Sequence, residues 1–187
     1  MGKFTPEIDE PVHLSPYNPE WPALFAAEAE RIVSNVHLRI AVEHIGSTSV
    51  AGLLAKPIID IMIGIQAEDT ESVRRNLRSL GYDDLGEAGV PGRLYFRKRV
   101  PHAFNVQVVH HDGPIWKSNI ALREHLRHDS EAARRYAEVK QSAIESGATM
   151  LLSYSEYKRE IVTELIARAK NCSQASSIST FNGAAIR

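Results

Sequence analysis

The sequence lacks the features that define several broad protein classes. Cys172 is its one cysteine, so no disulfide can form within the chain, which fits a reducing compartment. No apolar run approaches the roughly 20 residues that a membrane-spanning helix needs. Residues 1–10 contain no apolar core of a signal peptide. We therefore expect a cytoplasmic protein with no membrane partner.

Neither sign of charge is in excess. The chain has 22 basic and 23 acidic residues, and its formal net charge at pH 7 is −1. Proteins that bind nucleic acid through their overall field usually carry a basic excess. We therefore expect no nucleic-acid partner, and a local group of cations must recognise any phosphate-bearing ligand.

Two familiar motifs are also missing. A P-loop requires G-x-x-x-x-G-K-[ST], but Gly52 is followed by Leu53, and Lys56 is displaced from the lysine position. A G-x-S-x-G nucleophile elbow is excluded because Ser47 and Ser49 lack its flanking glycines.

The length of 187 residues and a hydrophobic content of 43% are enough for one domain with a buried core. We expect residues 1–11 to form a flexible arm and residues 12–170 to form the domain. Residues 171–187 are rich in Ser, Asn and Gly and show no periodicity, so we expect a disordered tail.

Hydrophobic spacing predicts the secondary structure of this domain. Helices are predicted over residues 19–36 and 69–80, and three more follow residue 114. Ser130 and the Ser153–Glu156 pair carry the capping signals of the last two. The predicted strands are residues 38–45, 58–65, 93–100 and 103–109.

The last two strands alternate between apolar and polar residues. Leu94 and Phe96 share one face of their strand, whereas Asn105 and Gln107 lie opposite the apolar residues of theirs. This pattern predicts a sheet with one core face and one ligand face. The expected fold is α/β (α+β), with a mixed, largely antiparallel sheet of about five strands. The N-terminal helix and the C-terminal helices are expected to pack on its apolar face.

The stretch HIGSTSVAGLLAKPIIDI, residues 44–61, joins two of these strands. Gly46, Ser47, Thr48 and Ser49 form a loop of small residues, which can hold phosphate oxygens through backbone amides and hydroxyls. Asp60 is the only charge inside the second strand, and a carboxylate there needs a cation, a metal or several donors as partners. The two features together predict a site for phosphate and metal.

This stretch resembles the pattern of the nucleotidyltransferase superfamily, in which a Gly-Ser loop precedes a strand that carries metal-binding acids. Within that superfamily it is similar to the GrpB family, whose members carry blocks like HIGSTSV-x-GL-x-AKPIIDI. Other blocks also match: YNPEWP at residues 17–22, Gly92-Arg93 with Tyr95-Phe96, residues 122–127, and, in the C-terminal helices, Tyr136 with Lys140 and Tyr157-Lys158.

The resemblance implies Mg²⁺-dependent nucleotidyl or phosphoryl transfer from ATP or another NTP to a small-molecule acceptor. Asp60 would bind the metal, and Arg93 would stabilise developing charge. The phosphates would be held by the loop residues Gly46, Ser47, Thr48 and Ser49 together with Lys56. Acceptor choice would lie with Arg93, Asn105, Gln107 and Arg123, and an uncharged Asn/Gln pair suits a neutral amide, hydroxyl or base edge.

The chain departs from its relatives at positions that matter for chemistry. The second acid expected near Asp60 is Ile58 or Met62, and Gln107 stands where relatives usually have His. A glutamine cannot act as a general base because its amide does not titrate. These departures leave a second hypothesis open, namely a non-catalytic nucleotide- or CoA-binding regulatory module.

Each of these residues also has a structural alternative. Asp60 could cap the Gly46–Ser49 loop, whose hydroxyls could merely form turns. Lys56 could pair with Asp60 or with a surface acid, and Arg93 could be solvated. Arg123 could form an ion pair with Glu124, Glu131 or Glu156. Arg97, Lys98 and Arg99 are expected to be a solvated run of charge.

Overall fold

The computed structural model describes residues 8–182, and side chains up to residue 171. Its five-stranded sheet has the order β1-β2-β5-β4-β3. β2 and β5 are parallel, whereas the pairs β1–β2, β4–β5 and β3–β4 are antiparallel. The predicted mixed, largely antiparallel sheet is therefore confirmed. The strands are β1 (Ala41–Ile45), β2 (Ile59–Ile65), β3 (Asp83–Asp84), β4 (Arg93–Lys98) and β5 (Phe104–His110).

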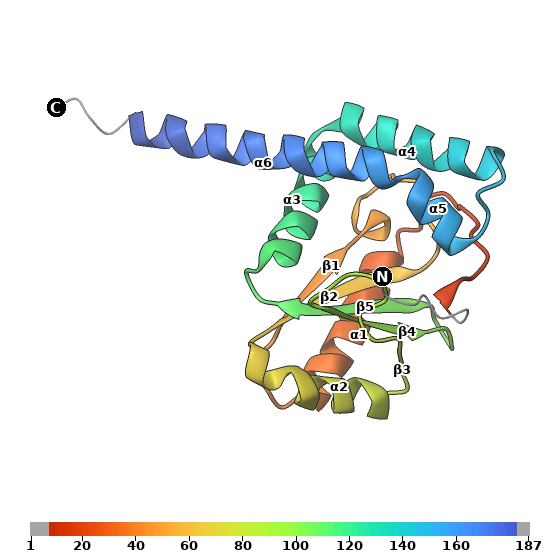
Figure 1. Ribbon diagram of the computed structural model, residues 1–187, viewed down its shortest axis with the longest axis vertical. Helices are drawn as coiled ribbons and strands as arrows, with labels where there is room; N and C mark the ends of the chain where they lie inside the picture. Colours follow the sequence, from red (N-terminus) through yellow and green to blue (C-terminus); the bar gives the residue numbers. More distant parts are fainter. Residues whose placement is uncertain (1–7, 183–187) are drawn as a thin grey trace.

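The helices surround this sheet in two layers. Figure 1 shows α2 below the sheet and the C-terminal helices above it. Short 3-10 turns, η2 (Ser47–Ser49) and η3 (Ala67–Asp69), follow β1 and β2. No helix in the described part of the chain is both long and apolar enough to cross a membrane. The helices are α1 (Trp21–Asn35), α2 (Thr70–Ser79), α3 (Pro114–His128), α4 (Ser130–Glu145), α5 (Leu151–Tyr157) and α6 (Arg159–Asn182).

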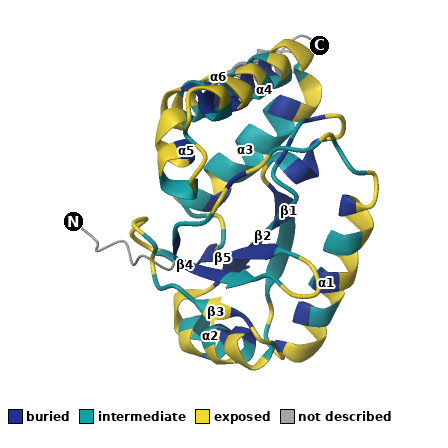
Figure 2. Cartoon of the chain, turned by 90° about the vertical axis from the view of Figure 1, so that its right-hand side faces the viewer, coloured by how far each residue is buried: buried dark blue, intermediate teal, exposed yellow. Residues whose placement is uncertain are grey.

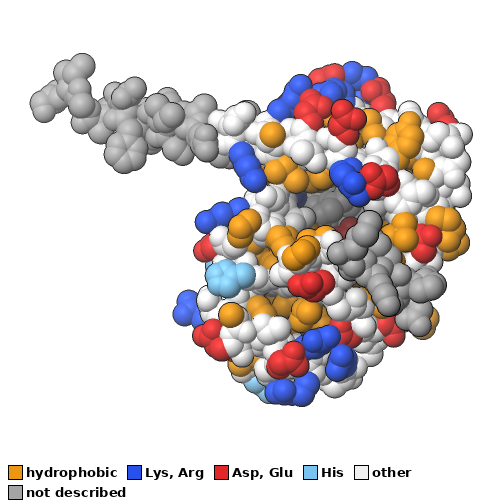
Figure 3. Space-filling view, in the orientation of Figure 1, with side chains coloured by type: hydrophobic (Ala, Val, Ile, Leu, Met, Phe, Trp, Pro, Cys, Tyr) orange, Lys and Arg blue, Asp and Glu red, His pale blue; other side chains and the backbone are white. Residues whose placement is uncertain are grey.

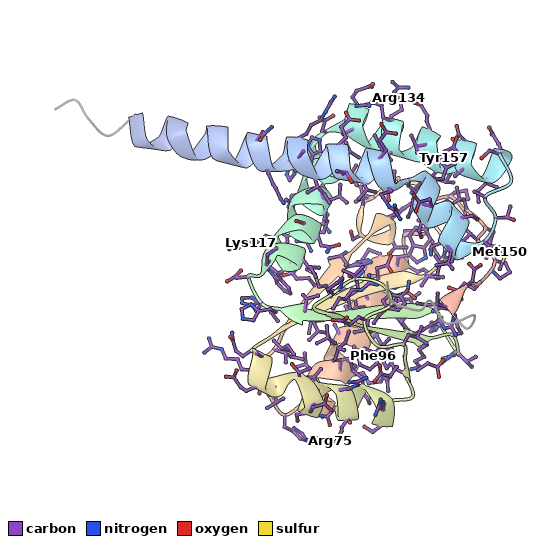
Figure 4. The ribbon with its side chains drawn as sticks, viewed as in Figure 1. Arg75, Phe96, Lys117, Arg134, Met150 and Tyr157 are labelled. Atoms are coloured by element: carbon purple, nitrogen blue, oxygen red, sulfur yellow. The ribbon has the colours of Figure 1, made fainter. Side chains whose placement is uncertain are left out.

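The main core lies on the face of the sheet that α1 and α2 cover. Alternate residues of the strands point to this face, among them Ile61 of β2, Phe96 of β4 and Val106 of β5, and each is fully buried. Ile32 of α1 and Leu77 of α2 complete the cluster. Figure 4 shows Phe96 between the sheet and α2.

The C-terminal helices pack on the other side, which corrects the expectation that all helices share the apolar face. Leu126, Tyr136, Ile161 and Leu165 build a separate cluster with Val50 and Leu53. These helices carry apolar stripes that bury one another, so they do not need the apolar face of the sheet. The polar face of the sheet therefore faces the C-terminal helices, on the side away from α1 and α2. Figure 2 shows the two helical layers on either side of the sheet.

The two ends that were predicted to be flexible or disordered contain ordered residues. These are residues 8–10 at the N-terminal end and the continuation of α6 at the C-terminal end. Ile8 is buried, Glu10 forms an ion pair with Arg99, and the amide of Leu151 donates to the Glu10 carbonyl. Helix α6 continues to Asn182, because a helix nucleated by packing extends at little cost per residue. Residues 1–7 and 183–187 of the predicted arm and tail lie outside the described residues.

Two predicted helix starts were wrong by a few residues. Asp129, not Ser130, caps α4, since its carboxylate accepts a hydrogen bond from the amide of Ala132 at 2.9 Å. Ser153 lies inside α5, where its hydroxyl donates to the Met150 carbonyl. The charged cap at Asp129 satisfies amides that the serine was expected to satisfy.

A buried polar cluster joins α1 to the β3–β4 side of the sheet. The Tyr82 hydroxyl donates to Glu28 at 2.5 Å, and Arg31 donates two hydrogen bonds to the same carboxylate. Burial acts to raise the pKa of Glu28, but the bonds from Arg31 and Tyr82 outweigh it and lower the pKa. Glu28 is therefore ionised at neutral pH and holds the two elements together.

We predict that Tyr82→Phe lowers the free energy of unfolding by about 1.5–3 kcal/mol, because it removes a donor from a charged, buried acceptor. Urea denaturation measures this difference. Tyr157→Phe is the matched control, since Tyr157 is 46% exposed on the helical layer (Figure 4). Equal effects of the two substitutions would show that the Glu28 cluster does not stabilise the fold.

Candidate functional site

A cavity of about 530 Å³ lies between the polar face of the sheet and the C-terminal helices. Ile8 also lines it, so the N-terminal segment closes part of the wall. On the face seen in Figure 3, basic and acidic side chains are interspersed. Most of the predicted site residues line the wall of the cavity, namely Gly46, Ser47, Thr48, Lys56, Asp60, Arg93, Asn105 and Gln107.

The register of the strands fixes where the polar side chains of the floor lie. Asp60 pairs with Asn105, which in turn pairs with Arg97. Gln107 lies two residues further along β5, between Met62 and Tyr95. The strands form the floor of the cavity. One row of paired residues across it carries the charge of Asp60, and the next row, which contains Gln107 and Tyr95, is neutral.

Asn105 orients the carboxylate of Asp60. The Asn105 Nδ2 group donates to Asp60 Oδ1 at 2.8 Å, and Asn105 Oδ1 accepts from Arg99 Nη2 at 3.0 Å. A guanidinium can only donate and a carboxylate can only accept, so these partners determine which way the amide points. Arg99 is held in turn by Glu10 through two hydrogen bonds of 2.9 and 2.5 Å.

Gly46 allows this carboxylate to lie against the loop. Its φ of +70° strongly favours glycine, and a Cβ atom there would lie 2.4 Å from Asp60 Oδ2. The backbone of the loop and the acid of the neighbouring strand therefore depend on each other. The sequence signal for this contact is the Gly-Ser pair at the end of β1.

The three hydroxyls of the loop have different surroundings. Thr48 is buried and lies 3.0 Å from His44 Nε2, and Ser49 donates to the Gly46 carbonyl at 2.6 Å. Burial, with Arg127 and Arg123, lowers the pKa of His44 to about 4, so its ring is neutral at pH 7. Thr48 and Ser49 therefore shape the loop, as the turn-forming alternative expected, whereas Ser47 contacts a lysine.

That lysine, Lys140 of α4, was not among the predicted site residues. It is 1% exposed, and its ammonium group donates to Ser47 Oγ at 3.0 Å and to the Leu54 carbonyl. Burial, together with Lys158 and Lys56, lowers the pKa of Lys140 to about 7. Burial also lowers the pKa of Lys56. Three lysines therefore gather on the loop side of the cavity.

Three cations of this site, Lys140, Lys158 and Arg93, each lie over a tyrosine ring. Lys140 Nζ lies 4.8 Å from the Tyr136 ring and Lys158 Nζ lies 4.6 Å from the Tyr154 ring. Arg93 lies 4.9 Å from the Tyr95 ring in the same way. Within residues 8–171 none of the three cations forms an ion pair with a carboxylate. A tyrosine ring attracts a cation without cancelling its charge, so the cavity stays positive.

A sequence signal for two of these pairs exists. Tyr136 and Lys140 are four residues apart on α4, and Tyr154 and Lys158 repeat this spacing where α5 ends. Residues at i and i+4 lie on one side of a helix, so each lysine can cover its tyrosine. The two Tyr-x-x-x-Lys repeats could therefore be recognised in the sequence. That the folded chain brings both lysines to one site could not be predicted.

Arg123 does not reach the cavity, which corrects its assignment to the site. Its guanidinium donates to Glu43 at 2.6 Å, to the His44 carbonyl at 2.9 Å and to Glu124 at 2.7 Å. The structural alternative was an ion pair with Glu124, Glu131 or Glu156, and Glu124 is the partner observed. Arg123 therefore joins α3 to β1.

The expected solvated run of charge at residues 97–99 was also wrong. The Arg99 side chain is 27% exposed and bound to Glu10 and Asn105, so it supports Asp60 indirectly. Lys98 is 15% exposed and lies 3.5 Å from Glu28 on the opposite face of the sheet. Strand alternation sends these neighbours to two different buried networks.

Among the described residues, no second acid lines the cavity beside Asp60. Met62, one of the two candidate positions, is fully buried among Ile45, Val109 and Trp116. Across residues 8–171 no three His, Cys, Asp or Glu side chains are grouped so that they could hold a metal ion. A divalent cation at Asp60 would therefore take most of its ligands from substrate oxygens and water.

We predict that Gly46→Ala destabilises the protein more than Gly52→Ala does. Gly52 also has a positive φ, of +77°, but a Cβ there meets nothing within 4 Å, so only the backbone cost of about 1–2 kcal/mol applies. At Gly46 the Asp60 carboxylate must also move. Urea denaturation of both variants measures the difference, and equal losses would mean that the carboxylate moves freely.

A second prediction concerns pH. Lys140 has a lower pKa when folded, about 7, than its ordinary 10.5, so the unfolded chain binds more protons between these values. Wild-type stability should therefore rise with pH over this window relative to Lys140→Met, by up to about 1.4 kcal/mol per pH unit. Lys117→Met, at an exposed position, is the control. A constant difference between pH 7 and pH 10 would contradict the shift.

Comparison with known proteins identifies relatives of this chain. UPF0157 protein PA4798 of Pseudomonas aeruginosa is 34% identical over 166 residues, which cover 86% of this chain and 69% of the relative. UPF0157 protein YqkA of Bacillus subtilis is 31% identical over 161 residues, which cover 82% of this chain but 46% of the relative. The shared part therefore represents less than half of that relative.

A solved structure supports the same relationship. The crystal structure of conserved protein GrpB from Enterococcus faecalis aligns with a TM-score of 0.76 at 28% identity, covering 84% of this chain and 96% of that one. The family model described as GrpB protein matches residues 11–168, which include every residue discussed above except Ile8, Glu10 and residues beyond 168. The chain belongs to the GrpB family.

Proposed function

We propose that the cavity binds a nucleoside triphosphate such as ATP together with Mg²⁺ and transfers its nucleotidyl or phosphoryl group to a small-molecule acceptor. The observation that carries this proposal is one oriented carboxylate among cations that no carboxylate of the described residues neutralises. The Gly-Ser loop and the acid-bearing strand, which resemble the nucleotidyltransferase pattern, support it further.

The charges of the cavity favour a ligand with several negative charges. Lys56 and Lys158 line it on the loop side, and Asp60 is the one acid among the described residues of its wall. Burying cations without counter-charges costs free energy, which a phosphate chain would recover on binding. Ser47 would bind the terminal phosphates from the loop side, and the buried Lys140, 3.0 Å from its hydroxyl, would add positive charge behind it.

The residues present fit a magnesium ion that is held mainly by the substrate. Asp60 Oδ1 accepts one hydrogen bond from Asn105, which leaves lone pairs on both oxygens for a cation. Mg²⁺ commonly binds proteins through one or two carboxylates and keeps phosphates and water as its other ligands. When bound, it would neutralise charge on the transferred group.

The protein's own groups would position the reactants. Asn105 and Arg99 keep the Asp60 carboxylate fixed, so no reorganisation is needed when charge develops. The lysines on the loop side would stabilise the leaving phosphates. The N-terminal segment and α5 form part of the wall, where they would limit the access of water as a competing acceptor.

A second candidate function is a non-catalytic module that binds a nucleotide or coenzyme A. Two observations favour it: Met62 fills one position where a second acid was expected, and Gln107 has no titratable group. The cationic cavity would serve binding alone equally well. Thermal stabilisation by ligand without turnover is the signature of this function.

We predict that Asp60→Asn lowers the release of pyrophosphate or phosphate from NTPs by about 100-fold or more, because it removes the one carboxylate that the described residues place in the cavity. The assay supplies each NTP, Mg²⁺ and a metabolite extract as the source of acceptor. Asp83→Asn is the matched control, since Asp83 is exposed on β3.

The same proteins distinguish the two functions. Magnesium-dependent thermal stabilisation by a nucleotide, without turnover in the wild type, would support the binding module and contradict catalysis. Turnover that persists in Asp60→Asn would remove Asp60 from the site. If no nucleotide or coenzyme A stabilises the wild type, both functions are wrong.

A further inference from the structure

The cations of the cavity lie on two sides of Asp60. In the sheet order, β2 with Asp60 and β5 with Asn105 separate β4 from β1 and the loop that follows it. Lys140 contacts this loop, whereas Arg93 belongs to β4. The cavity therefore offers two separate places for negative charge.

The register gives the scale of this separation. Arg97 shares a row with Asp60, and Arg93 lies four residues further along β4. With about 3.3 Å per residue and 4.8 Å per strand, the Cα atoms of Asp60 and Arg93 are about 16 Å apart. A phosphate chain that contacts Ser47 and Asp60 therefore starts on the side of the sheet away from the end of β4 that carries Arg93, although the Asp60 charge still acts on Arg93 across the cavity. The nucleobase carries no net charge to place at that end of β4.

Arg93 is held without any anion. Its Nη2 group donates to the carbonyls of Glu87 at 3.3 Å and Ala88 at 3.0 Å, and Tyr95 lies beneath the guanidinium. The Nε group is buried and has no hydrogen-bond partner among the described residues. Burial lowers the pKa of Arg93, which reflects the cost of this desolvated cation. An anion bound here would offset that cost.

Neutral hydrogen-bonding groups lie between Arg93 and Asp60. Gln107 and Tyr95 line the cavity and pair across the sheet, and neither side chain has a hydrogen bond to a described residue. An amide and a phenol can each donate to or accept from a hydroxyl group. The floor thus offers groups for a hydroxyl, with an anion site beyond them.

We propose that the acceptor is a hydroxyl compound bearing an anionic group, a phosphate monoester or a carboxylate, which Arg93 binds. This inference rests on the proposed function and names the class of its second substrate. The hydroxyl oxygen would attack phosphorus and form the new O–P bond. Pyrophosphate would leave with the electrons of the broken bond in nucleotidyl transfer, or the nucleoside diphosphate in phosphoryl transfer. The hydroxyl proton passes to water.

Calorimetry with three probes of similar size tests this assignment: glycerol 3-phosphate, glycerate and uncharged glycerol. Each is titrated into the wild type with and without Mg²⁺ and a non-hydrolysable ATP analogue. We expect at least one anionic probe to bind about 10-fold or more tightly than glycerol, and Arg93→Met to lose that preference. Arg93→Met should leave the affinity for the ATP analogue within about twofold.

Arg135→Met is the matched control, because Arg135 pairs with Glu164 on the surface and should change neither affinity. Equal binding of glycerol and the anionic probes, or an anion preference that survives in Arg93→Met, overturns the inference. Loss of analogue binding in Arg93→Met also overturns it, since Arg93 would then serve the nucleotide. If the analogue binds no variant, the proposed function fails, while the titrations without nucleotide still decide whether Arg93 binds anions.

Discussion

The contact between Gly46 and Asp60 is the constraint on which the site depends. The loop can pass over the strand only because no Cβ atom stands between its backbone and the Asp60 carboxylate. Asn105 holds the other carboxylate oxygen, and Arg99 and Glu10 hold Asn105. A chain of hydrogen bonds thus runs from Glu10 in the N-terminal segment to Asp60, and it fixes the geometry before any ligand arrives.

Three basic side chains of this site differ from those on the outer surface, because they form no ion pairs with the carboxylates of the described residues. On the outer surface, arginines such as Arg134 and Arg135 pair with glutamates. In the cavity wall Arg93 and Lys158, and behind it the buried Lys140, lie over tyrosine rings instead. Such an arrangement costs stability in the free protein, because desolvated cations lack counter-charges. The cost is recovered when an anionic ligand binds, which is typical of functional sites.

Local patterns predicted much of this molecule. Strand alternation identified the polar face with Asn105 and Gln107, and the spacing of the Gly-Ser loop and Asp60 located the centre of the cavity. The placement of the C-terminal helices could not be predicted, because their apolar stripes fit either a sheet face or one another. For the same reason Lys140 was missed and Arg123 was misplaced. Their partners, Ser47 and Glu43, lie 93 and 80 residues away along the chain.

The account makes one central claim, that phosphates and a divalent cation meet at Asp60. A crystal structure with Mn²⁺ and a non-hydrolysable ATP analogue tests it most directly, because the anomalous signal of manganese locates the ion. The account predicts manganese at the Asp60 carboxylate, with phosphate oxygens against Ser47 and Lys140. Manganese or phosphates bound elsewhere, with Asp60 still bonded only to Asn105, would contradict it.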